Sequence, residues 1–196
     1  MKARNRIKPL LTLCCALLLV AAGVFGTLAY LTGTDTVNNT FTVGNVKITL
    51  DEAKVTTDGT PVEGADRVKA NEYHLLPGHT YTKDPTVTVK ANSEACWLFV
   101  KVTESTDLKD FITYAIAEGW TALPGVDGVY YREVPASAAD QTFSVLADDA
   151  VTVKSDVTRT MLETAKTDAP TLTFKAYAIQ KDHFATADAA WTEVSK

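Results

Sequence analysis

The sequence has few residues that could bind a metal or activate water. Its three histidines are His74, His79 and His183, and only the first two are near each other in the chain. Metal-dependent hydrolysis needs converging ligands with a base beside them, as in a helical His-Glu-x-x-His motif. His74 and His79 are five residues apart across Pro77-Gly78, so they could meet only if that turn folded them together. We expect exposed loop histidines and no metal site.

Motifs for nucleophilic catalysis and phosphate binding are also absent from the sequence. It contains no Gly-x-Ser-x-Gly elbow and no glycine-rich phosphate loop. Acid pairs such as Asp148-Asp149 are typical of solvated turns. Asp35 and Asp51-Glu52 could bind calcium, but they lack the dense alternating acids of a calcium loop. We therefore predict no catalytic residue, no cofactor and no enzymatic activity.

Three cysteines are present, and two of them, Cys14 and Cys15, lie in an apolar run near the N-terminus. Cys96 is left alone and can form no internal disulfide, so the fold must depend on its core. Its apolar neighbours, from Ala95 to Val100, predict a small buried residue and not a reactive thiol.

The first 29 residues have the three parts of an export signal. Met1 to Pro9 is basic, Leu10 to Gly26 is apolar except for Thr12, and Thr27-Leu28-Ala29 has a small residue at each end of a three-residue stretch. We predict cleavage between Ala29 and Tyr30, with Thr27, Ala29 and Tyr30 as the signal-peptidase site. An uncleaved membrane anchor is the alternative, since the apolar run through Leu31 is long enough to span a bilayer.

The charge is divided between the signal and the remainder. The signal holds four basic residues and no acid, so a chain of net charge −5 leaves −9 for residues 30–196. An acidic surface repels phosphate and anionic lipid. We expect no nucleic-acid partner, and contact with the membrane only through the signal before cleavage.

Residues 30–196 are expected to form one β-domain, because threonine alternates with apolar residues along much of the chain. In the first predicted strand the apolar residues occupy odd-numbered positions up to Val43 and even-numbered positions from Val46. This shift by one residue at Gly44-Asn45 predicts a β-bulge. Cys96 to Val102 is apolar on both faces and should be a central strand. The predicted strands are Phe41–Leu50, Thr80–Lys90, Cys96–Thr103, Phe111–Ala117, Trp120–Leu123, Val129–Val134 and Thr171–Gln180.

Turns and helices complete this prediction. Leu76-Pro77-Gly78 predicts a tight turn, Pro124 to Gly128 a hairpin loop, and Pro85 a strand start or edge. Helical signals are weak and cover Thr158–Lys166 and Thr186–Glu193, with Thr186 as a possible N-cap. The fold class is therefore all-β: a jelly-roll or Greek-key β-sandwich with one or two short helices, preceded by the signal helix.

Six aromatic residues fall in predicted strands. They could form an exposed carbohydrate-binding platform or a sandwich core, and strand position favours the core. They are Trp97, Phe99, Trp120, Tyr130, Tyr131 and Phe174.

Three blocks of the sequence resemble the TasA/camelysin family. They are Gly26 to Asp35 followed by Asn39 to Gly44, then Leu76 to Pro85, and Lys175 to Gln180. The resemblance implies a jelly-roll fold and export by a SipW-type signal peptidase in a Gram-positive bacterium. Resemblance to the best-known members of the family implies assembly into fibres of the biofilm matrix. Resemblance to camelysin-type members implies metallopeptidase activity instead.

The new N-terminus left by cleavage suggests how such fibres would assemble. A free extended segment can add to the open edge of a neighbouring sheet, and such head-to-tail contacts generate filaments. The expected function is thus a secreted structural protein of the extracellular matrix or cell surface. A cell-surface metallopeptidase and a monomeric adhesin remain the alternatives. The assembly segment comprises Tyr30, Leu31, Thr32, Val37, Asn39 and Phe41.

Overall fold

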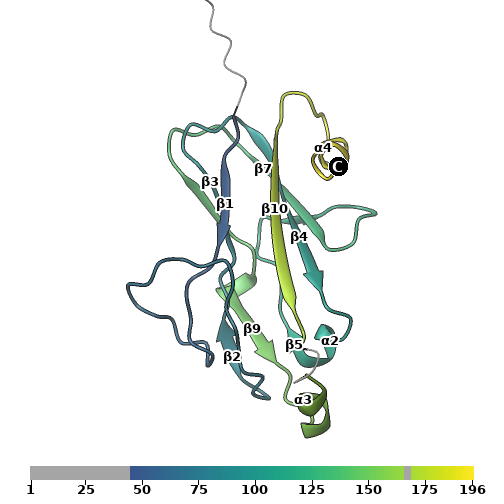
Figure 1. Ribbon diagram of the computed structural model, residues 1–196. Helices are drawn as coiled ribbons and strands as arrows, with labels where there is room; N and C mark the ends of the chain where they lie inside the picture. Colours follow the sequence, from purple (N-terminus) through teal and green to yellow (C-terminus); the bar gives the residue numbers. More distant parts are fainter. Residues whose placement is uncertain (1–44, 166–168) are drawn as a thin grey trace, which may run out of the picture. The chain divides into compact units, whose positions relative to one another are not determined.

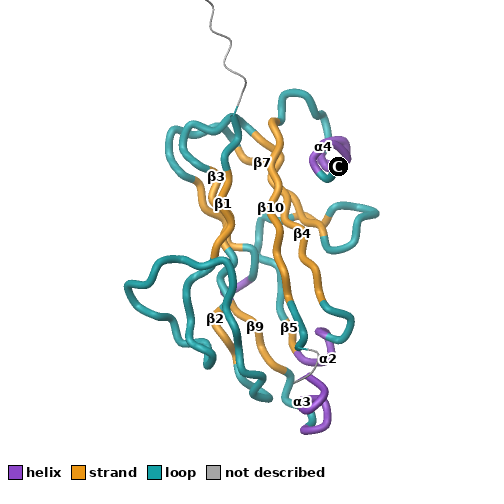
Figure 2. The backbone as a smooth tube through the Cα atoms, in the orientation of Figure 1, coloured by secondary structure: helices purple, strands orange, loops and turns teal. Residues whose placement is uncertain are grey.

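The computed structural model describes residues 45–165 and 169–196, and within them the strands form three antiparallel sheets (Figures 1 and 2). The all-β prediction is confirmed, although three sheets replace the two that were expected. The predicted signal helix lies outside the described residues.

The first sheet has the order β1-β3-β8, and its strands are β1 (Ile48–Asp51), β3 (Thr86–Val89) and β8 (Gln141–Ser144). The second has the order β10-β4-β7-β6, and its strands are β10 (Leu172–Gln180), β4 (Cys96–Glu104), β7 (Val129–Val134) and β6 (Thr121–Ala122). The third has the order β2-β9-β5, and its strands are β2 (Thr80–Thr82), β9 (Ala150–Val153) and β5 (Ile112–Thr113). The helical elements are α2 (Leu108–Phe111), a 3₁₀ turn η1 (Ala147–Asp149), α3 (Arg159–Ala165) and α4 (Ala187–Val194).

Strand β4 is the centre of the fold, as its sequence predicts. Because side chains alternate along a strand, its even-numbered residues face the first sheet, where Leu98 and Val100 are fully buried with Val87 and Val89 of β3. Its odd-numbered residues Trp97 and Phe99 face the other way and are covered by α4. Both faces of β4 are therefore apolar because both are packed.

A separate cluster lies at the third sheet. Tyr81 of β2 packs with Val151 and Val153 of β9, with Phe111 at the end of α2, and with Ala165 of α3. The side chains of this cluster fix the position of β2, from which the chain continues into β3.

Two turns and one helix cap agree with the sequence analysis. The amide of His79 donates to the carbonyl of Leu76 at 3.0 Å, and Gly78 has φ +75°, which closes the Leu76-Pro77-Gly78 turn. The loop from 124 to 128 joins β6 to β7 as a hairpin. The Thr186 hydroxyl accepts from the amide of Ala189 at 3.3 Å and caps α4.

Several predicted boundaries are wrong. The strand expected over Thr80–Lys90 is interrupted at 83–85, so that β2 and β3 belong to different sheets, with Pro85 directly before β3. Within Phe111–Ala117 the structure has the two-residue strand β5 and an isolated β-bridge from Ile116 to Leu146, and Phe111 instead ends a helix that was not expected. Strands β8 and β9 were not predicted. The proposed bulge at Gly44-Asn45 extends outside the described residues.

Candidate functional site

The first and second sheets meet at a seam between their edge strands β1 and β10, which lie side by side (Figures 1 and 2). A hollow of about 380 Å³ lies at one end of this seam, where β1 ends and β10 begins. A second hollow of about 600 Å³ lies at the other end, where Asn45 and Val46 approach the last residues of β10. We call these the lower and upper hollows.

Strand β10 has one edge without a partner among the described residues. Its other edge pairs with β4 over nine residues, from Leu172 to Gln180. Just beyond its ends, the amide of Ser105 donates to the carbonyl of Thr171, and the amide of Lys181 donates to that of Ala95. These bonds place the odd-numbered residues of β10 in hydrogen-bonded pairs with β4. The amides and carbonyls of its even-numbered residues therefore point into the seam.

The facing edge of β1 is more fully occupied. The amide of Lys90 donates to the carbonyl of Lys47, which places the odd-numbered residues of β1 in bonds with β3. Of the even-numbered residues, the carbonyl of Leu50 accepts from Lys69 Nζ at 2.5 Å, and Glu52 exchanges two backbone hydrogen bonds with Val68. Side chains and backbone from the segment 53–79 thus cover the end of β1, whereas no described strand forms hydrogen bonds with the facing edge of β10.

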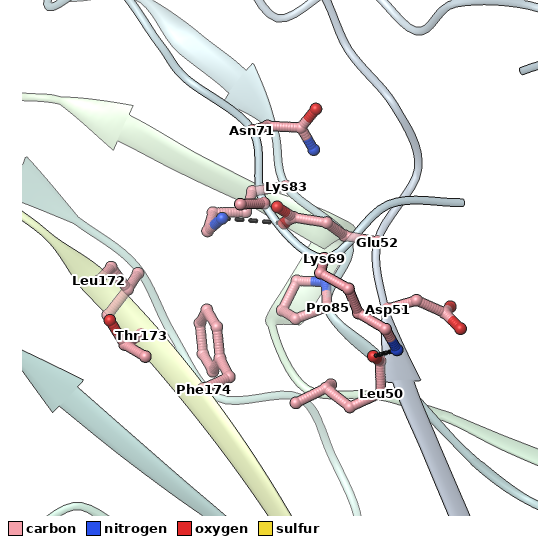
Figure 3. A pocket seen from close by; sticks show the side chains of 11 residues that line it. Leu50, Asp51, Glu52, Lys69, Asn71, Lys83, Pro85, Leu172, Thr173 and Phe174 are labelled. Atoms are coloured by element: carbon pink, nitrogen blue, oxygen red, sulfur yellow. Dashed lines mark hydrogen bonds and ion pairs between the residues drawn. The ribbon is translucent and has the colours of Figure 1, made fainter. Parts of the chain in front are cut away.

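A buried ion pair lies at the lower hollow (Figure 3). Lys83 Nζ is 2.8 Å from Glu52 Oε2, and the two side chains are only 10% and 7% exposed. The ammonium group also lies 5.2 Å from the ring centre of Tyr73 and 5.8 Å from that of Phe174 on β10. Burial, and then the nearby carboxylates of Glu52 and Asp84, raise the pKa of Tyr73, so its phenol stays neutral.

An arginine fastens the rim of the lower hollow. Arg67 forms ion pairs with Asp51 and with Asp84, the second at 2.9 Å, and also donates to both backbone carbonyls. The Asp84 carboxylate in turn accepts from the amide of Ala53 at 2.5 Å. Because these acids are already bonded within the chain, they hold the segment 53–79 against β1 and do not form a free ligand set.

The three histidines do not converge. His74, His79 and His183 are all exposed. His79 lies against the Tyr81 ring with its Nε2 3.2 Å from the carbonyl of Asp58, and His183 lines the upper hollow. No group of three or more His, Cys, Asp or Glu side chains that could hold a metal occurs within 45–165 and 169–196.

Cys96 is fully buried in the core between the first two sheets. Burial raises the pKa of its thiol to about 11, so the thiol stays protonated near neutral pH. None of the six predicted core aromatics is exposed: Trp97 and Phe99 are buried, and Trp120, Tyr130, Tyr131 and Phe174 are half-buried.

Lys83 and Arg132 were not among the predicted site residues, although their positions in the sequence are informative. One face of a predicted strand carries Tyr81, Lys83 and Val87. One face of another predicted strand carries Arg132 and Val134. A charged residue in the apolar phase of a strand indicates a cation placed inside the fold. The predicted signal-peptidase site (Thr27, Ala29, Tyr30) and the assembly segment (Tyr30, Leu31, Thr32, Val37, Asn39, Phe41) lie outside the described residues.

Comparisons with family models, curated proteins and solved structures found no match to this chain. In the part of the chain that the structure describes, no helix is both long and apolar enough to cross a membrane.

Proposed function

We propose that this chain is a secreted structural protein with a jelly-roll fold, related to the TasA/camelysin family, and that it forms fibres in the extracellular matrix or on the cell surface. Each subunit donates the segment Tyr30–Phe41 to the open edge of β10 in a neighbouring subunit. The export signal ends at Ala29 and is removed by a SipW-type signal peptidase.

The single observation that carries this proposal is that, among residues 45–165 and 169–196, one edge of the nine-residue strand β10 has no hydrogen-bonded partner strand. Such an edge presents unpaired amides and carbonyls, which bind an extended segment through main-chain hydrogen bonds. Each such bond contributes about 0.5–1.5 kcal/mol. Because β10 lies beside the core and has a hollow near each end, an added strand would gain apolar contacts as well as backbone pairing.

The sequence of the donated segment suits this edge. Val37, Asn39 and Phe41 are two residues apart, so they share one face of an extended strand. Burying a valine or phenylalanine side chain contributes about 1.5–3 kcal/mol. The donor segment precedes β1 in its own chain, so each subunit can both give and receive a strand. A contact of this kind does not close on itself and produces a filament.

The proposal is tested by blocking either half of the contact. Ala176→Pro removes an amide that faces the seam and leaves the bonds between β10 and β4 in place, so the domain should fold but form no filaments. Ala176→Gly keeps that amide and is the matched control that should still assemble. Deleting 30–39 should act like Ala176→Pro in electron micrographs of the secreted protein. Filaments formed by the deletion variant, or by Ala176→Pro, would contradict strand addition at β10.

Export has its own test. N-terminal sequencing of the secreted protein should give Tyr30 as the first residue, and Ala29→Trp should block processing because the pocket before the cut admits only small side chains. A chain that keeps Met1 in the membrane fraction would show that the segment is an anchor.

A further inference from the structure

The two strands that border the seam run in opposite directions (Figure 1). Strand β1 starts near the upper hollow, which Asn45 and Val46 line, and its last residue, Asp51, lines the lower hollow. Strand β10 starts at the lower hollow with Leu172 and ends at the upper hollow with Gln180. The chain therefore enters the described domain at the upper end of the seam.

The link between the donor segment and this entry point is short. Phe41 is four residues before Asn45, and an extended chain spans at most about 3.6 Å per residue, so their Cα atoms are at most about 14 Å apart. The hollows are farther from each other: Leu172 and Ala178 line one each and are six residues apart on β10, about 20 Å along a strand. A donated segment thus brings the upper end of its own subunit close to whichever hollow receives Phe41.

This short link distinguishes the two directions in which a strand could be added. If Phe41 entered the upper hollow of the acceptor, the upper ends of the two subunits would adjoin, and every further donor would be directed to the same place. Such contacts crowd together or close as a reciprocal pair. If Phe41 enters the lower hollow, the upper end of each donor adjoins the lower end of its acceptor. That contact repeats head to tail and extends a filament.

The lower hollow suits a phenyl ring. Its volume is about 380 Å³, whereas a cavity of about 150 Å³ already holds benzene. Leu50, Pro85 and Phe174 supply apolar contacts there (Figure 3). The Lys83 ammonium group lies 5.8 Å from the ring centre of Phe174 and attracts the face of a further ring.

We propose that the donated segment runs antiparallel to β10, with Phe41 anchored in the lower hollow of the acceptor. This rests on strand addition at β10, to which it adds the direction and the anchoring residue. The donated segment then runs from the upper to the lower hollow, as β1 does in its own subunit, so the chain needs no reversal between them. Val37, four residues before Phe41, falls beside Ala176 or Ala178, whose small side chains leave room for it.

Disulfide mapping between single-cysteine variants tests the direction. Thr42→Cys, which keeps Phe41, is mixed with Thr173→Cys at the lower hollow or with Ile179→Cys at the upper hollow. The only other cysteine of the secreted chain, Cys96, is buried. The monomers are mixed, assembled and oxidised, and mass spectrometry identifies the joined peptides. We expect the variant at Thr42 to join the one at Thr173 and not the one at Ile179.

The outcomes separate this inference from the proposed function. A disulfide between the variants at Thr42 and Ile179 overturns the direction and leaves strand addition at β10 in place. Filaments in which neither pair joins contradict strand addition itself, and the inference falls with it. The unmodified protein is assembled in parallel, and its failure to form filaments contradicts the proposed function in the same way.

The anchor has a separate test. Phe41→Ala should raise the critical concentration for filament growth by at least about tenfold, because a phenyl ring is no longer buried. Leu31→Ala is the matched control: Leu31 shares the phase of Phe41 but is ten residues from it, and so lies beyond the nine-residue β10. Its effect should be less than about twofold. An equal rise for both variants overturns the anchor, as does a lower urea midpoint of the Phe41→Ala monomer, since the ring would then pack in its own domain.

Discussion

Removing the ammonium group of Lys83 should destabilise the domain far more than removing an exposed one. Lys83→Met leaves the Glu52 carboxylate, which is only 7% exposed, without its partner at 2.8 Å. Breaking one side of a buried pair costs about 3–5 kcal/mol, because the remaining charge is desolvated and unpaired. For a domain of this size, each kcal/mol lowers Tm by about 2–4 °C, so we expect a fall of about 6–20 °C.

The matched control is Lys90→Met. Lys90 is 3.0 Å from Asp140, but the two side chains are 42% and 47% exposed, so water screens the pair. We expect a loss of less than about 1 kcal/mol. The double variant Lys83→Met/Glu52→Leu should recover most of the lost stability, because it replaces a buried pair by apolar side chains of similar size.

Urea unfolding followed by circular dichroism measures these differences at equilibrium. If Lys83→Met and Lys90→Met lose the same stability, the charge at the lower hollow is not buried as described. If the double variant is less stable than Lys83→Met alone, the unpaired Glu52 carboxylate is not the cause of the stability lost in Lys83→Met.

Three other predictions concern the core and the hairpin loop between β6 and β7. Leu98→Ala should cost about 2–5 kcal/mol in urea unfolding, because β4 is buried on both faces, and an unchanged midpoint would contradict this. Gly128→Ala should destabilise the domain more than Gly125→Ala in the same assay. Both glycines have positive φ, but of the two only Gly128 would place a Cβ against a backbone atom, the carbonyl oxygen of Val102, at 2.5 Å. The Cys96 thiol should react with a thiol reagent only after unfolding, and reaction as fast as that of a free thiol at neutral pH would show that it is accessible.

Much of the second sheet could be predicted from the sequence, because its signals are local. Val129–Val134 has the bounds expected for it, and Thr186 caps α4 as its position indicated. A helix cap and a hairpin loop depend on a few neighbouring residues. The two-sided burial of β4 follows from its continuous apolar run.

The elements that were missed depend on distant partners. Gln141–Ser144 contains one apolar residue, Phe143, and becomes a strand because it pairs with β3. Phe111 was assigned to a predicted strand that runs to Ala117, but in the fold it ends α2 and is buried at the third sheet. Tertiary contacts commonly override such weak local preferences.

The candidate site was harder to predict than the fold. Residues Tyr30–Phe41 were singled out as a donor, whereas the acceptor edge and the Lys83–Glu52 pair were not. Which edge of a sheet stays open depends on the strand order, and no local pattern in the sequence encodes that order. Lys83 and Arg132 could have been noticed as charges in an apolar phase, but their partners, or lack of them, are properties of the folded chain.

Hydrogen exchange along β10 tests strand addition most directly. In the monomer, the amides of Thr173, Lys175 and Tyr177 bond to β4 and should exchange slowly, whereas those of Phe174, Ala176 and Ala178 face the seam and should exchange quickly. Assembly should slow exchange of this second set to the rate of the first, because the donated strand bonds to it. Fast exchange at Phe174, Ala176 and Ala178 in assembled filaments would contradict the account, since the edge would then be open within the fibre.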